Sequence, residues 1–274
     1  MPFTPSHAAA ALLFRRTPLV TSAVVIGAIA PDLPYFLPVS TGRSFTHTPM
    51  GLVSIDLAIG VVTFLAWVLV LRAPLLDLGP RWLGDRMPRP FRPSPVSALT
   101  PARSALAGAT IVLSLVVGAA THLVWDSFTH PGWLVDHVPV LVATLGPLAL
   151  HKWLQHASSI AGLVLLAVFA VRWARRTPRL HDDDPRRAES VVGYRSRAAA
   201  WIGILAIFAV SGALAWTAAI EGGASPFDPV VVFLVARVSI GCALAGTGIA
   251  ISLWWVVRAY RERRTATTLP STSA

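Results

Sequence analysis

The sequence predicts an all-α, polytopic integral membrane protein: a helix bundle of about six spans with N- and C-termini in the cytoplasm. Apolar residues make up 54% of the 274 residues and charged residues only 13%, about half the ~25% of an ordinary soluble domain. Several mostly apolar stretches of bilayer-spanning length follow one another along the chain. Basic residues gather between alternate stretches, and this pattern predicts which loops lie on the cytoplasmic side of the membrane. This composition excludes a disordered chain and argues against a soluble enzyme.

Five stretches have the length that a bilayer crossing requires. They are residues 51–71, 104–124, 153–173, 199–219 and 229–257. A sixth candidate, residues 18–38, is interrupted by Pro31, Asp32 and Pro34. Residues 138–150 are too short to span and contain two prolines, so we expect a re-entrant or surface segment there.

The arginines predict the orientation of these spans. Twenty of the 23 basic residues lie at 15–16, in 72–103, in 172–198 or after residue 257. Short cytoplasmic loops carry an excess of Lys and Arg, so six crossings with both ends inside satisfy all four groups. The net charge of +10 therefore indicates orientation in a lipid bilayer. It does not indicate a nucleic-acid partner.

The predicted organisation is a single membrane-embedded helical domain over residues 1–265. Its motif-bearing half is 1–174, and a C-terminal helical pair covers 199–257. Residues 72–103 and 174–198 are expected to be cytoplasmic basic loops, and residues 266–274 a disordered tail. The sequence leaves the oligomeric state open.

Histidines collect in segments that the orientation places at the outer face. The single cysteine, Cys242, excludes a cysteine-based zinc site, so a metal would need His, Asp or Glu ligands. In the densest motif, His122 and Asp126 share one helix face at i, i+4, and His130 continues that stripe. Two imidazoles and a carboxylate suit zinc or a similar ion. The alternative is an interfacial helix end capped by polar residues.

Two shorter motifs point to the same face. Asp32 lies between prolines at the outer end of an apolar run, and His47 immediately precedes the next span. Each is weak alone, since the first could be a turn and Thr48 could simply cap the helix that Pro49 opens. Asp56, less than two turns inside that span, could orient a metal-bound histidine or could be satisfied by a helix partner.

Three further polar residues carry weaker signals. His151 and Gln155 are again at i, i+4, but glutamine is a poor metal ligand, so a second cluster there is less favoured. Arg237 lies inside the last span. It could snorkel to the interface or pair with a phosphate or carboxylate.

Four ordered motifs resemble a bacterial membrane family catalogued as domain of unknown function 4184. They also resemble the wider set of membrane-bound metal-dependent hydrolases. The motifs are Pro2-Phe-Thr-Pro-Ser-His7, Gly27-Ala-Ile-Ala-Pro-Asp32, Ser44-Phe-Thr-His47-Thr48 and His122-Leu-Val-Trp-Asp126-Ser-Phe-Thr-His130-Pro-Gly-Trp133. The resemblance implies a multi-pass protein of the bacterial cytoplasmic membrane.

A more distant likeness is to the zinc-dependent phospholipase C and single-strand nuclease superfamily, whose helical enzymes hold three zinc ions. In chain order its ligand roles would fall on His7, Asp32, His47, His122 with Asp126, His130, and His151 with Gln155. Gln155 replaces an acid and the superfamily's N-terminal tryptophan is missing, so we expect one or two ions. The charge rule places His7 on the inner side, where it would not be a ligand. The resemblance favours a hairpin of the first two short helices that enters the bundle from outside.

The predicted function is a metal-dependent hydrolase at the outer membrane face, acting on phospholipid or lipid-linked phosphoesters. The expected cofactor is a divalent metal, zinc, held by Asp32, His47, His122 and Asp126, with His7 and His130 as further ligands. Asp126 and His130 are the expected catalytic residues. Two alternatives are a non-enzymatic structural or stress-response membrane protein with a helix-pinning metal site, and a transporter.

Overall fold

The computed structural model describes residues 4–36, 43–87, 105–181, 184, 190–225 and 228–268. Helices dominate these residues, and a two-stranded ladder pairs β1 (Thr144–Leu145) with β2 (Leu148–Ala149). Five helical stretches are long and apolar enough to cross a membrane: Pro49–Leu78, Ala105–His137, Leu150–Arg176, Tyr194–Glu221 and Val230–Arg264. The predicted all-α polytopic bundle is confirmed.

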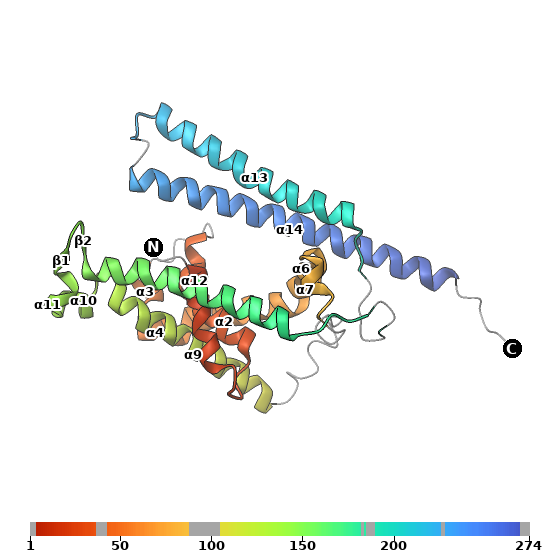
Figure 1. Cartoon of the computed structure of the whole chain (residues 1–274), viewed down its shortest axis with the longest axis horizontal. Helices are drawn as coiled ribbons and strands as arrows, with labels where there is room; N and C mark the ends of the chain where they lie inside the picture. The colour runs from red at the N-terminus through yellow and green to blue at the C-terminus, as the bar shows by residue number, and fades with distance from the viewer. Residues whose placement is uncertain are drawn as a thin grey trace. The chain divides into compact units, whose positions relative to one another are not determined.

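Figure 1 shows the helices in order along the chain. In chain order they are η1 (Thr4–Ala10), α1 (Ala11–Phe14), α2 (Thr21–Ile29), η2 (Ala30–Phe36), α3 (Arg43–Thr46), α4 (Pro49–Gly51), η3 (Leu52–Asp56), α5 (Leu57–Ala66), η4 (Trp67–Leu71), α6 (Arg72–Leu78), α7 (Arg81–Gly84), α9 (Ala105–Thr129), α10 (Trp133–His137), α11 (Pro139–Val142), α12 (Leu150–Arg176), α13 (Tyr194–Glu221) and α14 (Pro229–Thr268). The elements from α4 to α6 form one apolar stretch, in which η3 and η4 are π-helical turns.

The sixth predicted span is shorter than the other five. Its helical part is Thr21–Phe36, and the part containing Pro31 and Pro34 is a 3₁₀ helix. Proline has no amide hydrogen and restricts the residue before it, so the α-helix ends at Ile29. The cytoplasmic placement of both termini rests on the charge distribution alone and stays a prediction.

The chain divides into two compact units. Unit 1 comprises Met1–Leu69 and Ser94–Pro178, and unit 2 comprises Val70–Pro93 and Arg179–Ala274. The expected loop over 72–103 is wrong in its first part, where the apolar helix continues as α6 and α7 follows. Residues 88–104 lie outside the described residues.

The expected disordered tail, 266–274, is wrong at its start. Helix α14 continues to Thr268, and an Arg258–Glu262 pair at 2.8 Å supports its last turns at i, i+4. Residues 269–274 lie outside the described part of the chain.

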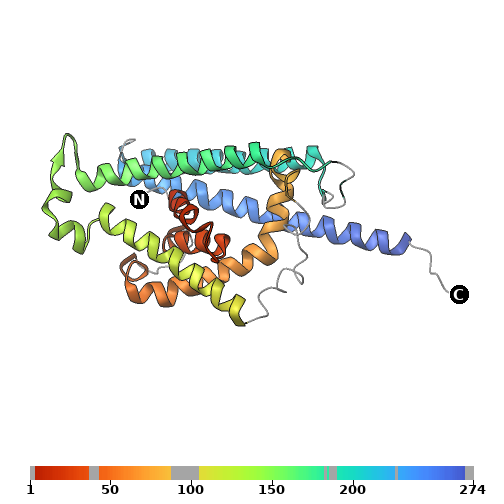
Figure 2. The ribbon, with the colours of Figure 1, turned by 60° about the horizontal axis from the view of Figure 1, so that its bottom comes forward.

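The core of unit 1 is the contact between α2 and α9, which pack beside each other (Figure 2). Ala23, Ile26 and Leu115 are its buried apolar residues. Glycines allow the two backbones to touch: a Cβ on Gly27 would collide with Leu115 O, and a Cβ on Gly118 would meet Val24 O and, at 2.8 Å, Ala28 N.

The N-terminal helices fold back on this core as a hairpin. Helix η1 packs against both α2 and α12, and a Cβ on Gly162 of α12 would lie 2.8 Å from Ser6 O. The hairpin that the resemblance favoured is present, and it brings residue 7 to α9.

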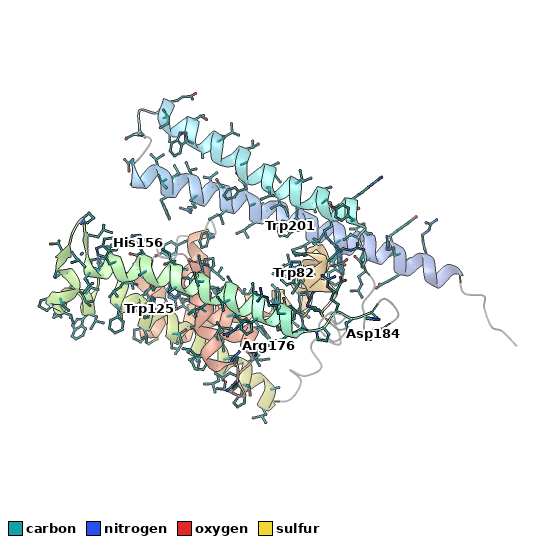
Figure 3. All side chains as sticks on the ribbon, in the orientation of Figure 1. Trp82, Trp125, His156, Arg176, Asp184 and Trp201 are labelled. Carbon is teal, nitrogen blue, oxygen red and sulfur yellow. The ribbon has the colours of Figure 1, made fainter. Side chains whose placement is uncertain are left out.

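In unit 2, α13 and α14 lie side by side (Figure 1). The buried Asp77 of α6 ties this unit together: its carboxylate accepts from Ser190 Oγ at 2.6 Å, Val191 N at 2.9 Å and Trp254 Nε1 at 2.7 Å. Trp201 of α13, labelled in Figure 3, donates its indole N–H to Leu78 O at 2.8 Å.

We predict that Gly118→Ala lowers the free energy of unfolding by about 1–3 kcal/mol, the usual range for overpacking a close-packed site. The added methyl group meets backbone atoms of α2, which cannot rotate away. Gly108→Ala on the same helix is the control, because a Cβ there meets nothing within 4 Å and removing a helical glycine stabilises. Thermal unfolding of the detergent-solubilised variants measures both, and equal melting temperatures would contradict the prediction.

Candidate metal centre

Five predicted site residues from separate segments of unit 1 converge. His7 comes from η1, Asp32 from η2, His47 from the turn after α3, and His122 and Asp126 from α9. They form two groups in which the possible ligand atoms lie within 4.8 Å of one another: His7, His122 and Asp126, and Asp32, His47 and His122. The two groups share His122, so they are parts of one cluster.

Four atoms of this cluster have the spacing of ligands around a single ion. His47 Nε2 lies 3.3 Å from His122 Nε2, 3.3 Å from Asp126 Oδ2 and 3.6 Å from Asp32 Oδ1. His122 Nε2 lies 3.5 Å from Asp126 Oδ2 and 3.7 Å from Asp32 Oδ1. Ligands at zinc distances in a tetrahedron are about 3.3–3.4 Å apart. The donor set and its spacing therefore fit a divalent cation.

The tautomer of His122 directs a lone pair into the cluster. Its Nδ1 lies 2.8 Å from Ala28 O, and a carbonyl oxygen only accepts, so Nδ1 carries the proton. Its Nε2 faces carboxylate oxygens of Asp32 and Asp126, and in the neutral ring this atom presents the lone pair that a metal ion would need. The ring is fully buried. Acceptors that face one another out of contact with water repel unless a cation lies among them.

Hydroxyl groups fix the other cluster residues. Thr4 Oγ1 donates to Asp32 Oδ2 at 2.7 Å, which leaves Oδ1 directed at the two histidines. Thr46 Oγ1 lies 2.9 Å from His47 Nδ1, which leaves Nε2 for the cluster. Thr48 accepts from Gly51 N at 2.9 Å and so caps α4, as the sequence suggested.

His7 completes the cluster from the hairpin. Its ring stacks on His122 with centroids 4.0 Å apart, and its Nε2 lies 3.6 Å from Asp126 Oδ1. Among the described residues, His7 Nε2 has no hydrogen-bond partner. Burial, reinforced by the nearby His122, lowers the pKa of His7 to about 4, against the opposing effect of the Asp126 and Asp32 carboxylates. His7 is therefore neutral at pH 7 and can bind a metal or accept a proton.

Asp56 is a buried carboxylate with no hydrogen bond. Its side chain is 1% exposed, and neither of its oxygens has a partner among the described residues. The helix partner that the sequence left open is thus absent from that part of the chain. The residue ends the π-helical turn η3, and such turns are frequent at functional sites.

The remaining predicted site residues lie outside the two ligand groups. His130 Nδ1 is 3.4 Å from Asp126 Oδ2, and Gln155 Nε2 is 3.4 Å from His130 Nε2. His151 Nδ1 lies 3.0 Å from Leu141 O, which ties α12 to α11. Arg237 is exposed on α14 in unit 2. The predicted metal and catalytic roles of these residues stay predictions.

The cluster lies near the ends of two long helices. His47 immediately precedes the candidate span Pro49–Leu78, and His122 and Asp126 lie in the last two turns of α9, within the candidate span Ala105–His137. Gln155, beside the cluster, lies near the start of α12. In Figure 3, His156 marks that end of α12 and Arg176 the other. The site is therefore at the opposite end of α12 from Arg175 and Arg176.

Sequence reasoning missed three groups that build the site: the hydroxyls of Thr4 and Thr46, and the carbonyl of Ala28. Thr4 is followed by Pro5, a pattern that is equally typical of a helix cap, and Thr46 is a hydroxyl residue beside His47 with no distinctive spacing. A backbone carbonyl has no sequence signature, so nothing could have indicated Ala28.

The fold and the cluster define a polytopic membrane protein with a buried His/Asp site that could hold a metal ion. The chain belongs to the family described as domain of unknown function DUF4184, whose model matches residues 1–254. No curated protein and no solved structure matches the chain. The likeness to hydrolases stays a prediction.

We predict that Asp126→Asn and His47→Ala each weaken divalent-metal binding by more than about 100-fold. Losing even an outer partner of a metal ligand costs about 10–100-fold. Metal content of the detergent-purified variants, measured by plasma mass spectrometry, tests this. His156→Ala is the control, because His156 is exposed on α12. Wild-type metal content in either cluster variant would contradict the site.

A second prediction concerns pH. With a folded-state pKa near 4 against 6.5 for the free side chain, His7 binds a proton more readily in the unfolded state. Its protonation therefore destabilises the fold as pH falls from 6.5 toward 4, by about 2 kcal/mol at pH 5. Thermal unfolding of metal-free protein should show a smaller loss between pH 7.5 and 5 for His7→Asn than for the wild type. Identical losses would contradict the buried, neutral His7.

Proposed function

We propose that the chain is a membrane-bound, metal-dependent hydrolase of phosphoesters, with phospholipid or lipid-linked phosphoesters as substrates. The observation that carries the proposal is a set of two imidazole nitrogens and two carboxylate oxygens, in which each histidine Nε2 lies 3.3–3.7 Å from the other three atoms. A bound divalent ion, zinc in this proposal, would supply an activated water with a pKa of about 7 and polarise the phosphoryl oxygen.

The chain's own residues would hold the ion and move the proton. Asp32, His47, His122 and Asp126 bind it, each through the atom that faces the cluster. The attacking water would give its proton to His7 Nε2, which lies 3.6 Å from Asp126 Oδ1. The water oxygen bonds to phosphorus, the bond to the leaving oxygen breaks, and that oxygen takes a proton from solvent.

The lipid nature of the substrate is inferred from the position of the site. His47 immediately precedes the candidate span Pro49–Leu78, and His122 and Asp126 lie in the last two turns of α9. The phosphate group of a lipid would lie near such helix ends in a bilayer. His47 is the most exposed of the four ligands at 12% of its side chain, whereas the other three are at most 5% exposed. We therefore place the substrate phosphate on the His47 side.

A helix-pinning structural site is the second candidate. Its support is the ligand count, because four protein ligands would close a tetrahedral zinc site and leave no position for water. Against it are two buried ionisable groups that such a site does not need, His7 and Asp56, each with unpartnered atoms. A transporter is less favoured, because the cluster lies at one end of the spans and does not follow them inward.

We predict that the zinc-loaded protein in mixed micelles hydrolyses bis(p-nitrophenyl) phosphate or a short-chain phospholipid. Chelation should abolish the activity and added zinc should restore it. His7→Asn should keep the ion but lose about 10²–10⁴-fold in kcat, the usual contribution of a proton-transfer group. His156→Ala should match the wild type.

The outcomes separate the two candidate functions. Loss of thermal stability on chelation, with no hydrolysis of either substrate by the loaded protein, would favour the structural site. If His7→Asn loses the ion, His7 is a ligand and its assignment as proton acceptor is wrong.

A further inference from the structure

Next to the candidate metal centre, a chain of polar side chains leads from Asp126 toward Lys152. Lys152 Nζ donates to Gln155 Oε1 at 3.0 Å, and Gln155 Nε2 lies 3.4 Å from His130 Nε2. His130 Nδ1 lies 3.4 Å from Asp126 Oδ2 and 3.0 Å from Thr129 Oγ1. Gln155 is 2% exposed and His130 7%, so water contributes little to their hydrogen bonding.

Because Lys152 can only donate, it determines which group donates and which accepts in each hydrogen bond between Lys152, Gln155 and His130. An ammonium group only donates, so the Gln155 atom that faces Lys152 must be the amide oxygen. The amide nitrogen, which only donates, is then the atom that faces His130 Nε2. His130 Nε2 must therefore be the acceptor, and the neutral ring carries its proton on Nδ1.

The Nδ1 proton of His130 is directed at the ligand carboxylate. Thr129 Oγ1 uses its own proton on Trp125 O at 3.3 Å, so it can only accept from His130. The His130 Nδ1–H is thus shared between Thr129 Oγ1 and Asp126 Oδ2. Such a hydrogen bond fixes the orientation of a metal-binding carboxylate.

We propose that Lys152 and Gln155 hold His130 as the Nδ1–H tautomer, so that His130 positions Asp126 for the metal. The three residues are positioning residues of the site in the proposed function, on which this inference rests. The inference also explains the residue type at position 155. Where the distant superfamily has an acid, an amide can donate to the histidine, which an ionised acid cannot do.

The residue type at position 152 agrees with this assignment. Lys152 is the only lysine among 23 basic residues, and the other 22 are arginines. An ammonium is a compact donor at the end of a flexible stem, whereas a guanidinium is a planar fork of five N–H groups. The acceptor here is the single amide oxygen of the buried Gln155, and one compact donor suits it.

The test reads the tautomer directly, with no reference to catalysis. Nitrogen NMR of ¹⁵N-histidine-labelled protein in lipid at pH 7.5 should show His130 with a protonated Nδ1 and a bare Nε2, assigned by loss of the signal in His130→Asn. Gln155→Glu places a carboxylate oxygen against Nε2 and should move a proton onto it. Lys152→Met should give a mixture of tautomers, because the Gln155 amide is then free to turn over. Lys152→Arg should restore the wild-type spectrum at least in part.

Zinc affinity, measured by competition with a chelator, is the second readout. Lys152→Met and Gln155→Leu should bind zinc about 10–100-fold more weakly than the wild type, as loss of an outer partner does. His156→Ala is the matched control on α12, since His156 is exposed there. A wild-type His130 signal with a protonated Nε2, or unchanged tautomer and affinity in both variants, would overturn the inference. Neither readout depends on turnover, so a protein that binds zinc in this way but hydrolyses nothing would refute the proposed function alone.

Discussion

The site depends on the close contact between α2 and α9. Gly27 and Gly118 have no side chains, so the two backbones touch, and Ala28 O then reaches His122 Nδ1 at 2.8 Å. This hydrogen bond fixes which nitrogen of His122 faces the cluster. Because α9 also carries Asp126 one turn later, the same contact sets the direction of both α9 ligands. The contact between α2 and α9 therefore orients His122 and Asp126. The segments that carry His7, Asp32 and His47 then pack against this oriented pair.

Charge is the physical reason why this cluster could hold a cation. Asp32 and Asp126 are almost fully buried, each with an oxygen close to His122 Nε2. Removing a carboxylate from water costs several kcal/mol, and an uncompensated charge inside a membrane protein costs more. Arginines cannot supply the compensation, because the sequence keeps them almost entirely between the spans and at the ends. A divalent ion held in the cluster would compensate both carboxylates.

The sequence predicted the parts of this arrangement that have a period or a composition. Hydropathy identified the five long helices, and the i, i+4 relation placed His122 and Asp126 on one face. It could not decide whether His7 reached the site, because that depends on a hairpin held by η1 packing on α2 and α12. The sequence indicated only that Gln155 is a poor metal ligand. It could not show that Gln155 links Lys152 to His130, because the direction of these hydrogen bonds depends on the positions of both partners. It also missed Asp77, whose donors come from residues more than 110 positions along the chain.

Asp77 shows what a purely structural buried carboxylate looks like in this protein. Its two oxygens accept from a hydroxyl, a backbone amide and an indole, and Arg197 lies 3.8 Å away. Every one of these groups donates, so the charge is balanced by the chain itself. Asp56 has no such donor among the described residues, and the cluster oxygen of Asp32 faces the Nε2 atoms of His47 and His122. A protein that satisfies one buried aspartate fully with its own donors has the means to satisfy the others. The contrast with Asp77 therefore favours a ligand in the cluster, whose His and Asp atoms are close enough together to hold a metal ion.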